Sequence, residues 1–148
     1  MKTLDSIVTS HPFVNTMRPE HLELLCKNAK EVEFAEGDLL FRQGDPANRM
    51  YLIQSGKVAL EAHEQGKTVP LQVLGTNDVL GWSWLFPPFS WNFQARATEP
   101  TRVIALDGGH LLVTCEENHD FGYELMKRVA QMVIHRLQTT RQQLLQRK

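Results

Sequence analysis

Turn-forming residues recur about every ten residues through the middle of the sequence, and this spacing most limits what the chain can fold into. The turns are Glu36-Gly37-Asp38, Gly44-Asp45-Pro46, Ser55-Gly56, Gln65-Gly66 and Gly75-Thr76-Asn77-Asp78. Between them lie short runs of strand-forming residues, a pattern typical of antiparallel sandwiches and jelly rolls. The sequence therefore predicts an antiparallel β jelly roll over residues 31–106. Pro70 lies inside one run, which predicts an edge strand or a bulge there.

Helical patterns flank the predicted β-roll on both sides. Pro19 can begin a helix that reaches Ala29, because apolar residues recur there at spacings of three and four. A shorter helix near the N-terminus is also indicated. Asp107 is placed to cap a helix through Cys115, and a long helix runs from about Phe121 towards the C-terminus. We therefore expect one domain, residues 1–148, with N-terminal helices in 1–30, the β-roll in 31–106 and C-terminal helices in 107–148.

A largely apolar stripe follows the long helix: Tyr123, Met126, Ala130, Val133, Leu137, Thr140 and Leu144. The spacings alternate between three and four, which is the pattern of a heptad seam. The stripe can pack against the chain's own β-roll, or it can pair in parallel with the same helix of a second copy. Because it runs to the end of the chain, further than a small roll would cover, we favour a homodimer.

Composition and motifs exclude several classes of function. The formal net charge of −1 gives no strong electrostatic attraction to nucleic acid irrespective of its sequence. No apolar run approaches the ~20 residues that a membrane helix needs. The N-terminus lacks a secretory signal, so we expect a cytoplasmic protein without membrane association. The absence of P-loop, serine-hydrolase, zinc-protease and dinucleotide motifs indicates a protein that is not an enzyme. Cys26, Cys115 and the six histidines lack metal-ligand spacing, so we expect no metal site.

Two stretches of the sequence resemble the cyclic nucleotide-binding domain family. One is Phe34-Ala35-Glu36-Gly37-Asp38-Leu39-Leu40-Phe41-Arg42-Gln43-Gly44-Asp45-Pro46, and the other is Met50-Tyr51-Leu52-Ile53-Gln54-Ser55-Gly56-Lys57-Val58. The resemblance continues through Gly75-Thr76-Asn77-Asp78-Val79-Leu80-Gly81, and His135-Arg136-Leu137-Gln138-Thr139-Thr140 is similar to the dimer helix of the catabolite activator proteins. It covers roughly residues 20–145 and implies an eight-stranded jelly roll with flanking helices.

The resemblance also implies a ligand pocket built on a phosphate-binding cassette. In the family, a Gly-Glu pair begins a short helix, and an Arg followed by Ser or Thr completes the site. Gly81 matches the glycine, but Trp82 stands at the Glu position, Trp91 at the Arg position and Asn92 at the hydroxyl position. The segment between Gly81 and Gln94 contains no Glu, Arg or Lys, so both strong ligand contacts of the family are absent. A cyclic nucleotide or a relative remains the implied ligand, and no other cofactor is expected.

All three tryptophans, Trp82, Trp84 and Trp91, lie in this segment. Such aromatic density can fill the pocket or cover a partner surface, or it can form a wall that stacks a planar or apolar ligand. Free N–H groups of the helix expected after Gly81, with Ser83 and Asn92 as neutral donors, are candidates for binding a phosphate. The resemblance aligns Thr140 with a hydroxyl that contacts the base. The candidate ligand-binding residues are Gly81, Trp82, Ser83, Trp84, Trp91, Asn92 and Thr140.

Basic side chains are frequent along the long helix, and we expect them to form a solvated face: Lys127, Arg128, Arg136, Arg141, Arg147 and Lys148. Arg96 is likewise expected to be a solvated surface charge. In the transcription regulators of the family the long helix leads into a helix-turn-helix domain. This sequence ends at Lys148 within the helix, so we expect no direct binding to DNA.

These observations predict a non-enzymatic regulatory module. It would bind a small ligand in the β-roll and signal through a dimerising C-terminal helix. The alternative is a ligand-free protein-interaction module whose pocket is filled by aromatic side chains, with a partner protein covering or releasing them.

Overall fold

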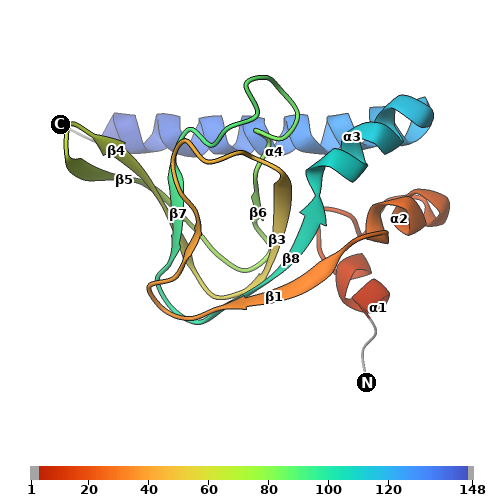
Figure 1. Cartoon of the computed structure of the whole chain (residues 1–148), viewed down its shortest axis with the longest axis horizontal. Helices are drawn as coiled ribbons and strands as arrows, with labels where there is room; N and C mark the ends of the chain where they lie inside the picture. The colour runs from red at the N-terminus through yellow and green to blue at the C-terminus, as the bar shows by residue number, and fades with distance from the viewer. Residues whose placement is uncertain (1–3, 147–148) are drawn as a thin grey trace.

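The computed structural model describes residues 4–146 and contains two four-stranded antiparallel sheets that form a β-roll (Figure 1). One sheet has the order β1-β8-β3-β6 and the other β2-β7-β4-β5. The strands are β1 (Lys30–Phe34), β2 (Leu39–Phe41), β3 (Arg49–Ser55), β4 (Val58–Glu64), β5 (Lys67–Leu74), β6 (Val79–Leu80), β7 (Gln94–Ala97) and β8 (Thr101–Asp107). The helices are α1 (Leu4–Thr9), α2 (Pro19–Cys26), α3 (Gly108–Glu117) and α4 (His119–Gln146). The predicted jelly roll with flanking helices is confirmed.

The proline inside the fifth strand lies where its missing N–H is tolerated. Pro70 belongs to β5, which is the outer strand of its sheet, and it pairs with Glu61 beside a bulge in the β4–β5 ladder. A proline cannot donate to a neighbouring strand, so an edge strand and a bulge are the positions open to it. Both parts of the prediction are confirmed.

The predicted helix boundaries shift where local geometry ends or starts a helix. The helix α2 ends at Cys26 rather than at Ala29, because Asn28 has a φ of 65° and turns the chain into β1. The predicted cap of α3 is confirmed, since the carboxylate of Asp107 accepts a hydrogen bond of 2.9 Å from the N–H of His110. The helix α4 follows α3 after Asn118.

The core consists of two apolar clusters on opposite faces of the sheet that contains β3 and β8. Tyr51 and Ile53 belong to the cluster inside the roll, whereas Leu52 and Ile104 belong to the cluster that packs against the helices. Successive side chains of a strand point to opposite faces, so a strand buried on both faces reads as a continuous apolar run. This explains why Met50-Tyr51-Leu52-Ile53 is buried throughout.

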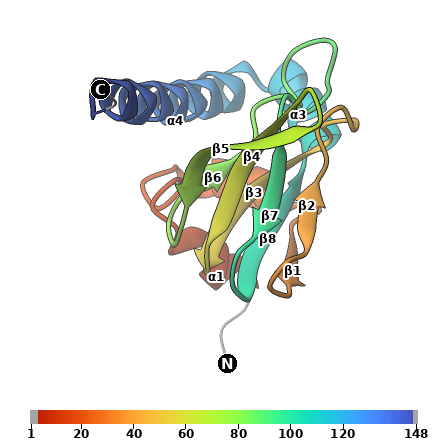
Figure 2. The same cartoon turned by 90° about the vertical axis from the view of Figure 1, so that its left-hand side faces the viewer.

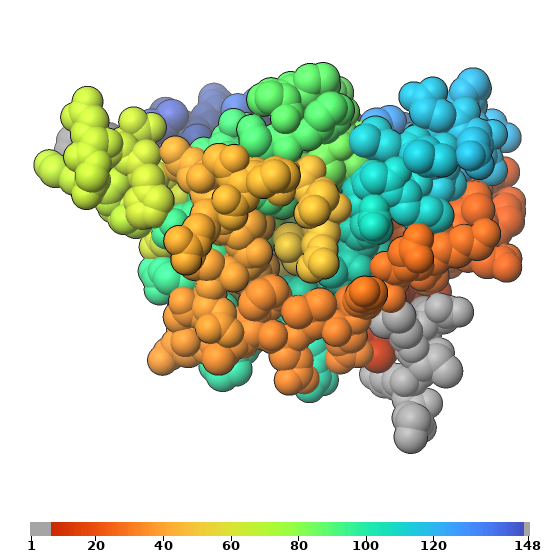
Figure 3. Space-filling model, in the orientation of Figure 1, coloured from red at the N-terminus to blue at the C-terminus, as the bar shows by residue number. Residues whose placement is uncertain are grey.

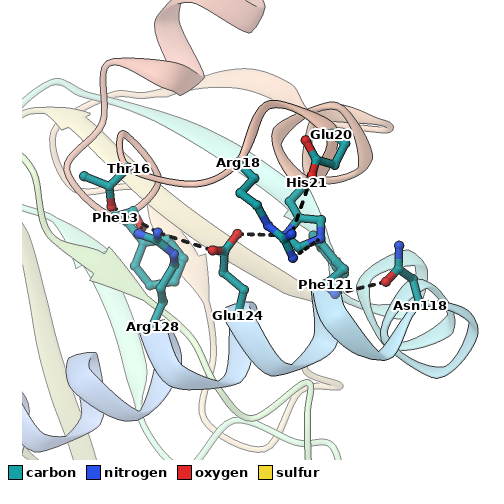
Figure 4. A network of polar contacts seen from close by, with 9 residues as sticks. All are labelled: Phe13, Thr16, Arg18, Glu20, His21, Asn118, Phe121, Glu124 and Arg128. Atoms are coloured by element: carbon teal, nitrogen blue, oxygen red, sulfur yellow. Dashed lines mark hydrogen bonds and ion pairs between the residues drawn. The ribbon is translucent and has the colours of Figure 1, made fainter.

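The long helix α4 passes behind the roll in Figure 1, from α3 towards the ends of β4 and β5, and Figure 2 shows it beside β5. Its N-terminal half is fixed to the N-terminal segment by polar contacts (Figure 4). The Nδ1–H of His21 donates to Glu124 over 2.8 Å, and Arg128 donates to the Phe13 carbonyl and to the Thr16 hydroxyl over 2.8 and 3.0 Å. No helix among residues 4–146 has both the length and the apolar character needed to cross a membrane.

The structure divides the heptad stripe of α4 into two rows. Met126 and Val133 pack against the helix-facing core cluster. The other row points outward: Tyr123, Leu137 and Leu144 are 67%, 66% and 62% exposed. One row of the stripe therefore packs on the chain's own roll, and the other leaves an apolar surface along the helix.

Candidate functional site

A groove of about 720 Å³ lies between the β4–β5 hairpin and the C-terminal half of α4. Its walls are mainly apolar and come from three parts of the chain. The sheet contributes Leu60, Val69 and Leu71, the segment between β6 and β7 contributes Trp82 and Phe93, and α4 contributes Arg136, Thr140 and Leu144. Apolar grooves with a few polar groups are the usual form of small-molecule sites. A ligand in this groove would contact the sheet and α4 together.

Arg136 is the charged side chain of the groove, and it is buried. Only 8% of its surface is exposed, and its Nη2 donates to the main-chain carbonyl of Val79. Its guanidinium lies 5.3 Å from the centroid of the Trp82 ring, within the range of a cation–π contact. Burial lowers the pKa of Arg136 to about 10, although the negative charge of Asp78 opposes this change. The side chain is therefore still a cation at neutral pH.

The second terminal nitrogen of this guanidinium is not satisfied. Nη1 of Arg136 is buried and finds no hydrogen-bond acceptor within residues 4–146. A buried charged donor without an acceptor costs more than an ordinary lost hydrogen bond, so such groups are rare in folded proteins. The expectation that Arg136 belongs to a solvated face of the helix is wrong, because this residue points at β6 and away from water. Arg147 and Lys148 of that predicted face lie outside the described residues.

A glutamine of the edge strand connects the sheet to α4. The Gln72 amide donates to the Thr140 hydroxyl over 2.7 Å and to the Arg136 carbonyl over 3.2 Å. The Thr140 hydroxyl in turn donates to the Arg136 carbonyl over 3.0 Å. Thr140 therefore lines the groove with its hydroxyl already engaged. A ligand that moved Gln72 would change the contact between β5 and the helix.

Aromatic side chains fill the interior of the roll next to the expected cassette. The Trp91 indole is buried and stacks on the Phe41 ring, with centroids 3.6 Å apart and planes at 8°. The ring centroids of Tyr51 and Phe41 lie 6.2 Å apart, and the two ring planes are inclined by 21°. Gly81 has a φ of +111°, and a Cβ there would lie 2.9 Å from Trp91 Cη2. The glycine is thus required both by its backbone angle and by the indole beside it.

The other predicted ligand-binding residues between Gly81 and Phe93 differ in their exposure to solvent. Trp84 is 1% exposed, donates from Nε1 to the Gly81 carbonyl over 2.9 Å, and belongs to the helix-facing core cluster. Ser83 is buried and Asn92 is exposed. Of the predicted site residues, the structure thus brings Trp82 and Thr140 together in the groove, whereas Trp84 and Trp91 are core residues.

The short helix expected after Gly81 is absent, and this prediction is wrong. Residues 83–88 form successive turns and bends instead, and Ser90 forms an isolated bridge with Pro46. Pro87 and Pro88 offer no backbone N–H and restrict the residue before each of them, which disfavours a helix. The helix N-terminus that was expected to receive a phosphate therefore does not exist here.

A polar cluster lies on the sheet β2-β7-β4-β5 at a second, smaller hollow. The carboxylate of Glu61 accepts hydrogen bonds of 3.2 and 2.7 Å from Arg96 and one of 2.8 Å from Gln94. His63 contacts Gln94 over 2.6 Å. The hydrogen bond from Arg96 lowers the pKa of Glu61, burial opposes this, and the bond from Gln94 adds to it. Arg96, predicted as a solvated charge, is instead paired and its side chain is 39% exposed.

Arg136 lines the groove but is not among the site residues predicted from the sequence. A signal for it was present, because Arg136 precedes Thr140 by four residues and both therefore lie on one face of the helix. The burial of Arg136 could not be read locally, since its acceptor on Val79 lies in β6, far away in the sequence.

Two bacterial regulatory proteins resemble this chain in sequence over most of its length. A CRP-like cAMP-activated global transcriptional regulator of Mycobacterium tuberculosis is 25% identical over 128 residues, which are 86% of this chain and 57% of that protein. A cyclic AMP receptor protein of Thermus thermophilus is 30% identical over 96 residues, which are 64% of this chain and 44% of that protein. This chain thus spans about half the length of these two relatives.

A comparison of three-dimensional structures agrees with the sequence comparison. A solved structure of a candidate cyclic nucleotide-binding protein from Geobacter metallireducens aligns with a TM-score of 0.81 and 27% identity, over 91% of this chain and 98% of that one. The sequence pattern of the cyclic nucleotide-binding domain family matches residues 31–118, more than half of the chain. The matched segment contains nearly the whole β-roll together with α3. The chain therefore belongs to the cyclic nucleotide-binding domain family.

Proposed function

We propose that this protein is a non-enzymatic, ligand-sensing regulatory module. A small ligand, a cyclic nucleotide or a relative, binds in the groove between the β4–β5 hairpin and α4. Binding changes the contact of α4 with the sheet, and α4 passes the change to a second copy of the chain. Family membership supports the regulatory role, and the names of relatives that include cAMP support the ligand class.

The observation that carries the proposal is that one groove is bounded by both the sheet and the helix. Trp82 and Leu71 stand on one side, and Arg136 and Thr140 stand on the other. A ligand that touches both sides binds with different affinity when the helix moves, and such a difference is what a conformational switch requires. The contacts of Glu124 and Arg128 hold the first half of α4 to the N-terminal segment, whereas its C-terminal half is held at the groove itself, through Gln72 and the Val79 carbonyl, so a ligand there acts on the contacts that fix this half.

The outward row of α4 supports the proposed dimer. Tyr123, Leu137 and Leu144 are spaced by multiples of seven and are each more than 60% exposed, and Ile134 and Leu145 extend the same apolar surface. Two such helices side by side would bury these rows in a parallel pair. Substitution of Leu137 by Glu would place like charges in the seam. The expected result is a change from dimer to the 17.0 kDa monomer in light scattering at micromolar concentration.

A titration of tryptophan fluorescence with cyclic AMP and cyclic GMP tests the ligand. Trp82 lines the groove, whereas Trp84 and Trp91 are buried, so substituting Trp82 by Phe identifies the source of any change. A saturable change at micromolar ligand that disappears in W82F is expected. No change up to millimolar ligand, in protein shown to be folded by circular dichroism, would exclude both cyclic nucleotides.

A ligand-free interaction module is the second candidate function, and two observations favour it. The aromatic stack of Trp91 on Phe41 fills the interior of the roll. The loop after β6 also exposes Phe86 and Phe89, at 61% and 40%, and this loop protrudes at the top of Figure 3. Native mass spectrometry separates the two functions: a small molecule retained on the purified protein favours the sensor, and its absence together with no response to added ligand favours the interaction module.

A further inference from the structure

We propose that the smaller hollow on the sheet β2-β7-β4-β5 is a second ligand site, which takes a compact oxyanion with phosphate or carboxylate groups. Arg42 and Arg96 hold this anion. The hollow has a volume of about 500 Å³ and shares no lining residue with the groove beside α4. The inference therefore goes beyond the proposed function and does not rest on it.

The hollow lies outside the roll, on the sheet that faces the viewer in Figure 2. Gln94 and Arg96 flank Ala95 in β7, and Ala95 belongs to the core cluster inside the roll. Because successive side chains of a strand point to opposite faces, Gln94 and Arg96 point outward. Among the described residues that line the hollow, Leu39 is the sole large apolar side chain. The hollow therefore suits a polar ligand, whereas the groove has mainly apolar walls.

The charges of the lining favour an anion. Two arginines, Arg42 and Arg96, line the hollow, and no carboxylate does so among the residues that the structure describes. Arg42 is exposed, and its side chain enters no ion pair within residues 4–146. The nearby Asp45 carboxylate accepts from the main-chain N–H of Arg42 over 3.3 Å. Two like charges on one hollow repel each other, and an oxyanion between them removes this repulsion.

Arg96 offers a guanidinium edge that is held in place. Its Nε and Nη2 donate to the Glu61 carboxylate over 3.2 and 2.7 Å, so this contact uses one edge of the guanidinium. The edge formed by Nη1 and Nη2 remains for a ligand, because Nη1 has no acceptor within residues 4–146 and is not buried. Such an edge fits two oxygens of a carboxylate or phosphate. Since Glu61 balances the charge of Arg96, Arg42 supplies the net positive charge of the site.

Hydrogen bonds behind the hollow fix the side chains around Arg96. The Gln94 amide donates to Glu61 over 2.8 Å, so its oxygen faces His63 and accepts from Nε2 of that ring over 2.6 Å. The Thr68 hydroxyl lies 3.1 Å from Nδ1 of the same ring, to which it can donate. Glu61 is thus engaged on one side and keeps Arg96 in one position. Donors that are fixed before a ligand arrives lose less conformational entropy on binding.

An NMR titration of the full, ¹⁵N-labelled chain tests the site. The probes are inorganic phosphate, glucose 6-phosphate and citrate, with glucose as the uncharged partner of glucose 6-phosphate, at pH 7 and at constant ionic strength. The Nε–H signal of Arg96 and the amides of Arg42 and His63 report on the hollow. At least one anion is expected to shift these signals saturably, and glucose is not. The anions that do so distinguish a phosphate group, free or on an organic molecule, from a cluster of carboxylates.

Substitutions then assign the binding to the two arginines. Arg42→Met is expected to weaken the affinity about tenfold, the value of one hydrogen-bonded charged contact. Arg96→Lys keeps a cation beside Glu61 but lacks the fork, and should weaken it about threefold. Arg141→Met removes an exposed arginine of α4 that lines neither the hollow nor the groove, so the affinity should be unchanged. Circular dichroism verifies that each variant is folded.

Four outcomes overturn the inference. If no anion shifts the signals of the hollow, the site does not exist. Shifts that do not saturate at tens of millimolar would mean an adventitious ion only. If R42M and R141M weaken binding equally, net charge attracts the anion and the hollow does not. If binding is unchanged in R42M and R96K, the anion lies elsewhere. None of these outcomes bears on the groove, which the fluorescence titration tests separately.

Discussion

The Trp91 indole lies parallel to the Phe41 ring at a centroid distance of 3.6 Å, inside the roll and against Gly81. The family resemblance places the phosphate-binding arginine at position 91. At the position where the family has a charged contact with phosphate, this chain has a stacked aromatic pair. The Trp91 indole is 97% buried, so it leaves no room for a phosphate in the same place. This pair explains why the groove, and not the interior of the roll, is the candidate site.

Truncation of this indole should destabilise the fold strongly. Trp91→Ala removes a buried aromatic side chain together with its stacking on Phe41, which typically costs about 3–5 kcal/mol. Urea denaturation measures the loss as a lower midpoint, and Asn92→Ala, an exposed neighbour, should change the free energy of unfolding by less than about 0.5 kcal/mol. Equal effects of the two substitutions would show that Trp91 does not support the core.

Removal of the buried charge in the groove should stabilise the ligand-free protein. Burial lowers the pKa of Arg136 from its ordinary value to about 10, which corresponds to roughly 3 kcal/mol against the charged form. Arg136→Met removes this cost but also the bond to the Val79 carbonyl, so we expect a net gain of about 1–2 kcal/mol, in line with replacements of buried ions by apolar residues.

Thermal unfolding without ligand checks this gain. An increase of a few degrees in Tm is expected for R136M, and none for the exposed control Arg141→Met. A lower Tm for R136M would mean that the contact of Arg136 with β6 contributes more to stability than its charge costs. A side chain that costs stability in the place where it lies is a common feature of functional sites.

The features that could be predicted from the sequence are those with local causes. Turn residues fixed the strand spacing, Pro70 indicated an edge and a bulge, and the Asp107 carboxylate capped α3 as expected. Each depends on the backbone preference of a few neighbouring residues. The flanking helices followed from apolar periodicity, and their ends shifted by two or three residues where a cap or a left-handed residue intervened.

The parts of the site that could not be predicted depend on distant contacts. Trp82 and Trp84 are two residues apart, yet one lines the groove and the other is buried against Gly108, because the turns after Gly81 have no fixed period. Arg136 looked like one of several basic side chains on a solvated helix. It is buried against the Val79 carbonyl of β6, and the residue pattern of a helix carries no information about such a distant acceptor.

The Glu61–Arg96 pair predicts a pH dependence of stability. The hydrogen bond from Arg96 lowers the pKa of Glu61 below its value of 4.5 in the unfolded chain. A carboxyl group whose pKa is lowered on folding contributes stability above pH 4.5 and loses it as the pH falls through the folded value. Glu61→Gln should therefore be less stable at pH 7 by about 1 kcal/mol, a figure reduced for the partial exposure of Arg96.

This difference between the unchanged chain and E61Q should shrink below pH 4.5. Chemical denaturation at pH 7, 5 and 3.5 measures it, with Glu64→Gln as the control, since Glu64 is exposed at the end of the same strand. A stability difference that stays constant over this pH range would show that ionisation of Glu61 is not its source.

The contact of His21 with Glu124 should determine the local stability of the first half of α4. Burial opposes ionisation of Glu124, but the hydrogen bond from His21 and contacts with Arg18 and Arg128 outweigh it and lower the pKa of this carboxyl group. A double-mutant cycle with His21→Gln and Glu124→Gln should give a coupling of about 1 kcal/mol, since the two groups share a partly buried hydrogen bond of 2.8 Å.

Hydrogen exchange then locates the effect along the helix. In E124Q, amides of residues 121–130 should exchange faster, because this substitution weakens the contact that holds that half to α2. Amides of residues 134–142 should be unchanged, since Gln72 and Val79 hold that half to the sheet. Equal loss of protection along all of α4 would show that the helix opens as one unit, and a ligand in the groove would then have to move its entire length.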